Sequence, residues 1–184
     1  MSVTIRPTAP HEYRTAQAAM AIPLLSAPLG DEDWERSAPS WDEMVSFSAW
    51  EDGECLGHAG HFPVETVVPG GALLATGAVS RVGVLPTARR RGIATELMHR
   101  LIFDAAERGQ VLMSLRASEA TIYGRYGFGI AGDFGEARLD PVRAQPIGGA
   151  TTDGDIRLLA PDEIVPTIGP LYERCMHRRV GAVT

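Results

Sequence analysis

The sequence has 184 residues, 45% of them hydrophobic and 22% charged, which suits one soluble globular domain with a substantial core and room for part of another. Its formal net charge of −6 argues against general nucleic-acid binding, because such binding needs a basic face. Cys55 and Cys175 form no disulfide framework and no metal-ligand spacing. The sequence has no signal-peptide core, and no apolar run reaches the ~18 residues of a membrane span. These features together predict a cytoplasmic protein.

The first half of the chain predicts two helices followed by an antiparallel meander. Hydrophobic spacing indicates, in chain order, a strand at 4–7, helices at 11–25 and 31–39, and strands at 44–50, 55–68 and 72–85. The helix at 11–25 is expected to bury Ala16, Ala19, Met20 and Leu24. Asp52-Gly53 predicts a tight hairpin turn, because both central residues of such a turn need positive φ. Pro63 is expected to break the strand at 55–68.

Trp34 lies within the acidic stretch at 31–39, and Trp41 follows it. Two tryptophans that flank acidic residues suit a cleft for a cationic substrate, which makes Trp34 a candidate for substrate contact. The alternative is that each tryptophan anchors its loop onto the core, which is the commoner role for one such residue alone.

His58 and His61 are the residues that most resemble a metal pair. Residues three apart on a strand face opposite sides, and no cluster of carboxylates or cysteines accompanies these histidines. The sequence therefore predicts structural roles for both and no metal site.

The stretch from Val79 to Thr95 predicts a strand, a tight turn and a helix, around which the chain is organised. The strand at 79–85 ends at Pro86, and the helix begins at Ile93 and stops near Gly109. The apolar face of this helix comprises Ile93, Ala94, Leu97, Met98, Leu101, Ile102 and Ala105.

The turn before this helix has the features of an anion site. A helix start offers unpaired backbone N–H groups and the positive end of a dipole. Gly92 lets the backbone approach a ligand closely, and Arg89, Arg90 and Arg91 add charge and bidentate donors suited to phosphate. The arrangement alone is equally compatible with a solvated basic tip on an ordinary loop.

A second buried strand is predicted at 110–117, parallel to the strand at 79–85. Such a strand–helix–strand unit brings both strand ends to one edge of the sheet, where ligands usually bind. Gly127, Gly129 and Gly132 have the spacing of a dinucleotide-binding turn, but residues 133–140 predict a strand where that turn needs a helix. No phosphate-binding loop of the Walker type and no nucleophile elbow is present.

Two groups of residues carry a resemblance to a known family. Arg89-x-x-Gly92-x-Ala94, placed between a strand and an amphipathic helix, resembles the acetyl-CoA pyrophosphate loop of the GNAT superfamily of N-acetyltransferases. Residues 86–92, 117–119 and 122–129 narrow the resemblance to its Eis-type (enhanced intracellular survival) branch. The fold class implied is α+β with α/β character: a mixed, mostly antiparallel sheet with flanking helices and a splayed pair of parallel strands.

The resemblance also implies a function and its residues. It implies transfer of an acetyl group from acetyl-CoA to a primary amine of an aminoglycoside, a polyamine or a lysine-type acceptor, with Tyr123 as general acid. From the residues alone, a packed core tyrosine is the favoured role of Tyr123. The residues expected around acetyl-CoA are Val82, Gly83, Val84, Arg89, Arg90, Arg91, Gly92, Ile93, Ala94, Thr95, Ser118 and Glu119. The rival hypothesis is a non-catalytic module that binds acyl-CoA and keeps the fold.

The C-terminal part is expected to differ from the rest. Residues 1–150 form the predicted acetyltransferase domain, and 151–184 either start a second acetyltransferase-like domain or form a C-terminal extension, since Eis-type proteins continue with further domains. A strand is predicted near 156–159 and a helix over 162–178, with one apolar face: Ile164, Val165, Ile168, Leu171 and Tyr172. That face needs cover from the chain's own core or from a second copy, so a homo-oligomer is one expected state.

Overall fold

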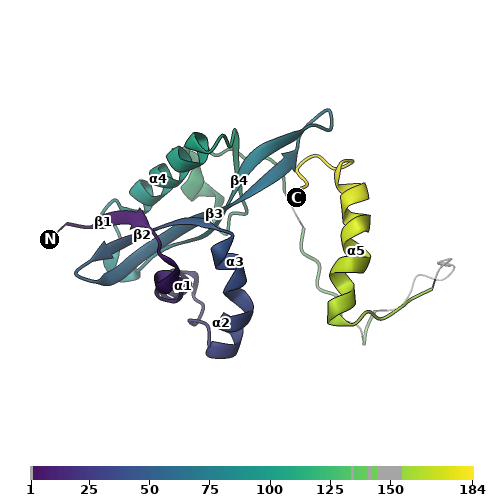
Figure 1. Ribbon diagram of the computed structural model, residues 1–184, viewed down its shortest axis with the longest axis horizontal. Helices are drawn as coiled ribbons and strands as arrows, with labels where there is room; N and C mark the ends of the chain where they lie inside the picture. Colours follow the sequence, from purple (N-terminus) through teal and green to yellow (C-terminus); the bar gives the residue numbers. More distant parts are fainter. Residues whose placement is uncertain (1, 134, 141, 145–154) are drawn as a thin grey trace.

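The computed structural model describes residues 2–133, 135–140, 142–144 and 155–184. Its centre is a five-stranded sheet in the order β1-β2-β3-β4-β5, in which the first four strands are antiparallel neighbours and β5 runs parallel to β4 (Figure 1). The strands are β1 (Thr4–Pro7), β2 (Val45–Glu51), β3 (Glu54–Val67), β4 (Leu73–Val84) and β5 (Leu112–Leu115). The prediction of a mixed, mostly antiparallel sheet is confirmed.

The hairpin between β2 and β3 turns where expected. Asp52 has a φ of 50° and Gly53 a φ of 85°, the left-handed pair that such a turn requires. The prediction that Pro63 breaks the next strand is wrong, because β3 continues through it and pairs Pro63 with Gly77 of β4. β2 begins at Val45, opposite His61, so Pro63 lies beyond the part of β3 that β2 covers, and there a missing N–H is tolerated.

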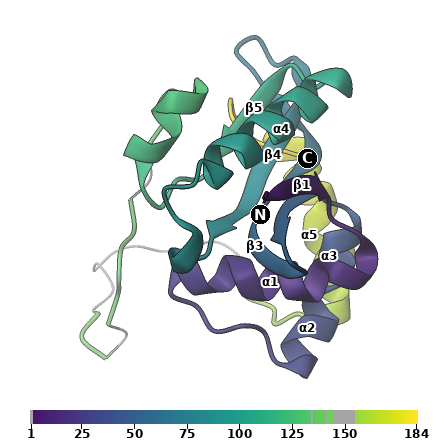
Figure 2. The ribbon, with the colours of Figure 1, turned by 90° about the vertical axis from the view of Figure 1, so that its left-hand side faces the viewer.

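Helices cover the two faces of the sheet. On one face lie α1 (Tyr13–Ala21), α2 (Asp31–Ser37) and α3 (Pro39–Asp42), and on the other lies α4 (Ile93–Glu107), as Figure 1 and Figure 2 both show. The first helix is shorter than predicted. A 3-10 helix follows at Ile22–Leu24, and Leu25 after it has a left-handed φ. Contrary to prediction, Leu24 is therefore 49% exposed and Met20 only half-buried.

Helix α4 supplies the main core. Five of its predicted face residues are buried, while Ala94 is exposed and Ile102 half-buried. They pack against the sheet residues Phe47, Ala49, Ala59 and Val79. The helix ends at Glu107, and Gly109 follows with a φ of 79°, as the stop signal predicts.

The parallel pair forms the expected splayed gap. The strand predicted at 110–117 is only Leu112–Leu115, and it pairs with Thr76 to Val79 of β4. β4 continues to Val84 without β5 beside it, so the two strands part after Val79. The strand predicted at 133–140 is wrong: Asp133 and residues 135–140 are exposed and irregular. The spacing of Gly127, Gly129 and Gly132 nevertheless does not form a dinucleotide-binding turn. Gly127 ends a 3-10 helix, and no helix follows within 128–133.

The last helix, α5 (Pro161–Met176), stands beside the sheet and not on it (Figure 1). Residues 155–160 form no strand, contrary to prediction. After α5, Val183 bridges to Thr66, and the N–H of Val67 donates to the carbonyl of Ala182 at 2.9 Å. The apolar face of α5 stays open, with Ile168 46% and Leu171 47% exposed. The expectation that the chain's own core covers this face is therefore wrong.

None of the described helices is long and apolar enough to cross a bilayer.

Cover by a second copy remains a prediction. If two chains bury this face against each other, replacing Ile168→Glu together with Leu171→Glu should shift the protein toward monomer in light scattering, because charges would enter the shared apolar surface. The control is Glu173→Gln, an exposed change on the same helix. An unchanged mass in the double variant would contradict self-association through α5.

Candidate functional site

A β-bulge distorts β4 where β5 has ended. His58 pairs with Gly83 and Gly60 pairs with Ser80, so one residue of β3 lies opposite two residues of β4, Arg81 and Val82. Arg81 has a φ of 57°, which is unusual for a residue with a side chain. Along Val82 to Val84 the edge of β4 that faces the gap is not paired with β5, so backbone groups there are available to a ligand.

His58 holds the bulge in place. Its side chain is fully buried, and its Nδ1 lies 2.8 Å from the carbonyl oxygen of Arg81. A carbonyl only accepts hydrogen bonds, so Nδ1 carries a proton. Burial lowers the pKa of His58 to about 4, which keeps the ring neutral at physiological pH. Sequence analysis assigned His58 a structural role but missed this contact, for which one strand alone gives no signal.

We predict that stability falls as the pH drops from about 6.5 to about 4, in part through His58. Between the unfolded pKa and the lower folded pKa, the unfolded chain binds a proton that the folded chain excludes, so acid favours unfolding. His58→Asn keeps an N–H for the Arg81 carbonyl but does not titrate. Its urea midpoint should therefore change less between about pH 7 and about pH 5 than that of the wild type.

A second variant separates the hydrogen bond from the titration. His58→Leu removes the donor and should lower the free energy of unfolding by about 1–3 kcal/mol at both pH values, because the buried carbonyl loses its partner. If His58→Asn shows the full pH dependence of the wild type, titration of His58 does not contribute.

The arginine turn has the backbone of an anion site. Arg90 and Gly92 both have left-handed φ, 62° and 79°, and Gly92 caps α4 by accepting the N–H of Glu96 at 3.0 Å. No described residue forms an ion pair with Arg89 or Arg90, and both are exposed. Their guanidinium groups and the start of α4 can therefore face a phosphate together.

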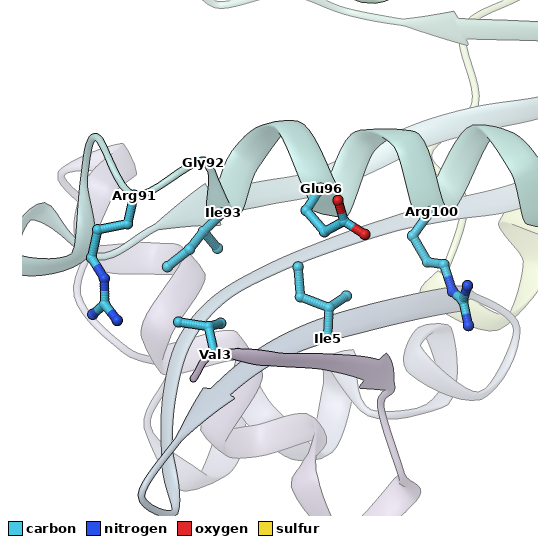
Figure 3. Close-up of a pocket in the computed structure, with 7 residues that line it drawn as sticks. All are labelled: Val3, Ile5, Arg91, Gly92, Ile93, Glu96 and Arg100. Carbon is cyan, nitrogen blue, oxygen red and sulfur yellow. The ribbon is translucent and has the colours of Figure 1, made fainter. Parts of the chain in front are cut away.

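Arg91 differs from its two neighbours. It donates two hydrogen bonds to the carboxylate of Glu51 at 2.9 and 2.6 Å, and this pairing holds the pKa of Glu51 below its usual range. Glu51 at the end of β2 thus offsets the charge of Arg91, and binding of the cofactor by Arg91 stays a prediction. Figure 3 shows Arg91 beside a cavity of about 470 Å³ between the N-terminal strand and α4, where Val3 and Ile5 face Ile93, Glu96 and Arg100.

Tyr123 lies across the gap on a 3-10 helix, η4 (Ala120–Tyr126). Its half-buried ring packs edge-on against Phe128 at 6.1 Å, and burial raises the pKa of its phenol. A raised pKa keeps the hydroxyl protonated at neutral pH, as a general acid requires. Tyr123 also lines a second cavity, of about 460 Å³, with the end of β5 and residues 128–133. Val82, Val84 and Tyr123 all pack against the core around α4.

Other predicted cofactor residues lie at the rim of the gap. Ser118 and Glu119 follow the end of β5 and are exposed, and Glu119 accepts a hydrogen bond from the Thr121 hydroxyl at 2.9 Å. Thr95 lies on the flank of α4, with its hydroxyl 3.5 Å from that of Tyr126. Sequence analysis missed Tyr126, which joins η4 to α4 and also contacts the ring of His99.

The other face of the sheet carries the two tryptophans. Trp41 is fully buried and is a core residue, whereas Trp34 is half-buried with its ring 5.9 Å from that of Trp41. Three acidic residues near Trp34 form ion pairs with arginines: Asp31 with Arg14, and Glu32 and Asp33 with Arg36. These ion pairs offset most of the negative charge expected to attract a cationic substrate.

The remaining candidate, a metal pair, does not form. His58 stacks on Trp41 on one face of the sheet, with ring centroids 5.1 Å apart. His61 lies on the other face, 4.0 Å from Asp104 of α4. Among the described residues there is no group of three or more histidines, cysteines or carboxylates that could hold a metal ion.

Comparisons with known proteins point to one family. Residues 5–131 match the family model of the acetyltransferase (GNAT) domain. An uncharacterized N-acetyltransferase of Streptomyces coelicolor is 37% identical over 141 residues, which are 74% of this chain and 34% of that protein. The N-acetyltransferase Eis of Mycobacterium tuberculosis is 31% identical over 172 residues, which are 87% of this chain and 43% of that protein. The chain thus spans between about a third and less than half of these relatives.

Solved structures agree with the family model. Eis1 from Mycobacterium abscessus has a TM-score of 0.60 and 37% identity, with 71% of this chain and 32% of that chain covered. A predicted acetyltransferase from Clostridium acetobutylicum, solved with acetyl-CoA, has a TM-score of 0.60 and covers 75% of this chain and 97% of its own. Its identity is 20%, so this likeness concerns the fold.

Proposed function

This chain belongs to the GNAT family of acetyltransferases, and on that premise we propose that it transfers an acetyl group from acetyl-CoA to a primary amine. The observation that carries the proposal is the bulged end of β4, which parts from β5 immediately before the arginine turn and the start of α4. The named relatives, including Eis, are N-acetyltransferases and support the reaction class. The acceptor candidates are an aminoglycoside, a polyamine or a lysine-type amine.

In the proposed complex, the two ends of acetyl-CoA meet different parts of the chain. The pyrophosphate would lie on the N-terminus of α4, between Gly92 and the unpaired Arg89 and Arg90. The thioester would lie along Val82 to Val84, where backbone N–H groups beside the bulge can stabilise the oxyanion that forms.

Proton transfer then occurs at two places. An amine with a pKa near 10.4 must lose a proton, here to solvent water, before it attacks the thioester, and the thiolate that leaves must gain one. Tyr123, at the end of β5 and protonated at neutral pH, is the proposed donor to the thiolate.

The test is release of free thiol from acetyl-CoA by the purified chain, with a polyamine, an aminoglycoside and a lysine peptide as acceptors. Turnover with any of them supports the enzyme. Calorimetry with CoA provides the comparison, because tight binding of CoA without turnover of any acceptor would indicate a non-catalytic module that keeps the fold.

A further inference from the structure

Arg81 places a positive charge beside the proposed reaction centre. It is the bulge residue of β4, so its backbone borders Val82, and its side chain extends over the face of the sheet that α1, α2 and α3 cover. Helix α4 lies on the opposite face (Figure 1), and the pyrophosphate is proposed to bind at its start. An amine that reached the thioester from the face covered by α1, α2 and α3 would pass the side chain of Arg81.

The guanidinium of Arg81 has only neutral partners among the described residues. It lies 4.4 Å from the centre of the Trp41 ring and 5.4 Å from that of Phe62, and it donates to the carbonyl oxygen and the hydroxyl of Ser40 at 3.3 and 2.6 Å. No described carboxylate pairs with it, and no described group accepts a hydrogen bond from its Nε. Donors thus remain for a ligand, since a guanidinium carries five N–H groups.

This environment contrasts with that of other arginines. Arg14 and Arg36 on the same face, and Arg91 near the turn, each pair with a carboxylate although they are more exposed than Arg81. A partly buried charge without a counter-ion is costly, and burial indeed lowers the pKa of Arg81. An anion on the ligand would offset that cost through charge-assisted hydrogen bonds.

We propose that the acceptor is an amine that also carries a carboxylate or a phosphate, and that Arg81 binds this anionic group. This inference rests on the proposed acetyltransferase function. It implies that Trp34, next to Trp41, contacts the body of an anionic substrate and not of a polycation.

Two matched pairs of acceptors test the proposal. Lysine is compared with cadaverine, which lacks its carboxylate, and glucosamine 6-phosphate with glucosamine, which lacks its phosphate. Each compound is titrated calorimetrically into the chain, with and without CoA, so the reading does not depend on turnover. The anionic member of one pair should bind about 10- to 100-fold more tightly, and the pair that responds identifies the anion. Equal or weaker binding of both anionic members, or no binding of any of the four, overturns the proposal.

Variants of Arg81 show whether this residue causes the preference. Arg81→Gln should weaken binding of the compound that carries the anionic group by about 10- to 100-fold and leave binding of its partner without that group within about twofold, while Arg81→Lys retains part of the preference. Unchanged affinity for CoA shows that the site is intact. An Arg81→Gln variant that keeps the full preference overturns the assignment, and if it does not fold, Arg81→Lys and the wild-type pairs decide.

The two proposals fail in different ways. Turnover of cadaverine or glucosamine at least as fast as of its partner with the anionic group would be consistent with the acetyltransferase and would contradict the role of Arg81. Tight CoA binding without turnover would remove the enzyme, while the calorimetric pairs would still report on Arg81.

Discussion

Gly92→Asp is expected to abolish binding of CoA. Gly92 has a φ of 79°, and no atom lies within 4 Å of the position that a Cβ would take, so the new side chain would project into the space proposed for the pyrophosphate. Its carboxylate would repel the phosphates and compete for Arg89, Arg90 and the N–H groups that start α4. Backbone strain adds to the effect, because a left-handed φ is unfavourable for most residues with side chains. Isothermal titration calorimetry with CoA measures the result.

The matched control is Gly92→Asn. Asparagine has nearly the same size and tolerates left-handed φ, but it brings no charge. Its CoA affinity should therefore lie between those of the wild type and Gly92→Asp, and urea unfolding of both variants checks that α4 still forms. Wild-type affinity in Gly92→Asp would place the pyrophosphate elsewhere.

Tyr123→Phe is expected to lower kcat by about 10²- to 10⁴-fold while CoA affinity stays close to normal. The change removes the proton donor of the thiolate, and general acids contribute rate factors of this size. The lower end is expected, because a thiolate with a pKa near 8.5 is already a tolerable leaving group. The ring contact with Phe128 survives the change, so the site should keep its shape. Steady-state thiol release measures kcat.

Tyr126→Phe provides the comparison on the same 3-10 helix. The Tyr126 hydroxyl has Thr95 as its neighbour, at the long distance of 3.5 Å, so its loss should change kcat by less than about tenfold. If Tyr123→Phe retains wild-type turnover, Tyr123 is a packing residue. If both variants lose activity equally, the defect lies in the helix and not in one hydroxyl.

Local patterns predicted the centre of this fold well. The turn at Asp52-Gly53, the helix from Ile93 and its stop near Gly109 follow from backbone preferences and from apolar spacing, which act within a few residues. The parallel pair was predictable for the same reason, since strand, helix and strand follow one another along the chain.

The errors arose where distant partners decide the outcome. Pro63 was expected to break its strand, yet the strand continues. A proline is tolerated there because the neighbouring strand β2 begins only opposite His61, and the extent of β2 cannot be read from the residues around Pro63. The bulge at Arg81 depends on one extra residue opposite β3, and its contact with His58 joins positions 23 residues apart. The ion pair of Arg91 with Glu51 was likewise not predictable, because 40 residues separate the two positions in the chain.

The hairpin of β3 and β4 extends beyond β2 at the end that lies away from the bulge. There β2 does not pair with β3, so the peptide groups of Glu65 and Val67 would face water if nothing else covered them. Unpaired strand edges promote aggregation, and here residues 182–184 occupy that edge: Thr184 donates its N–H to the carbonyl of Glu65 at 3.0 Å. The protected strand edge and the proposed site of acetyl transfer therefore lie at opposite ends of the same two strands. The short tail can be changed to alter solubility while the residues proposed for catalysis keep their neighbours.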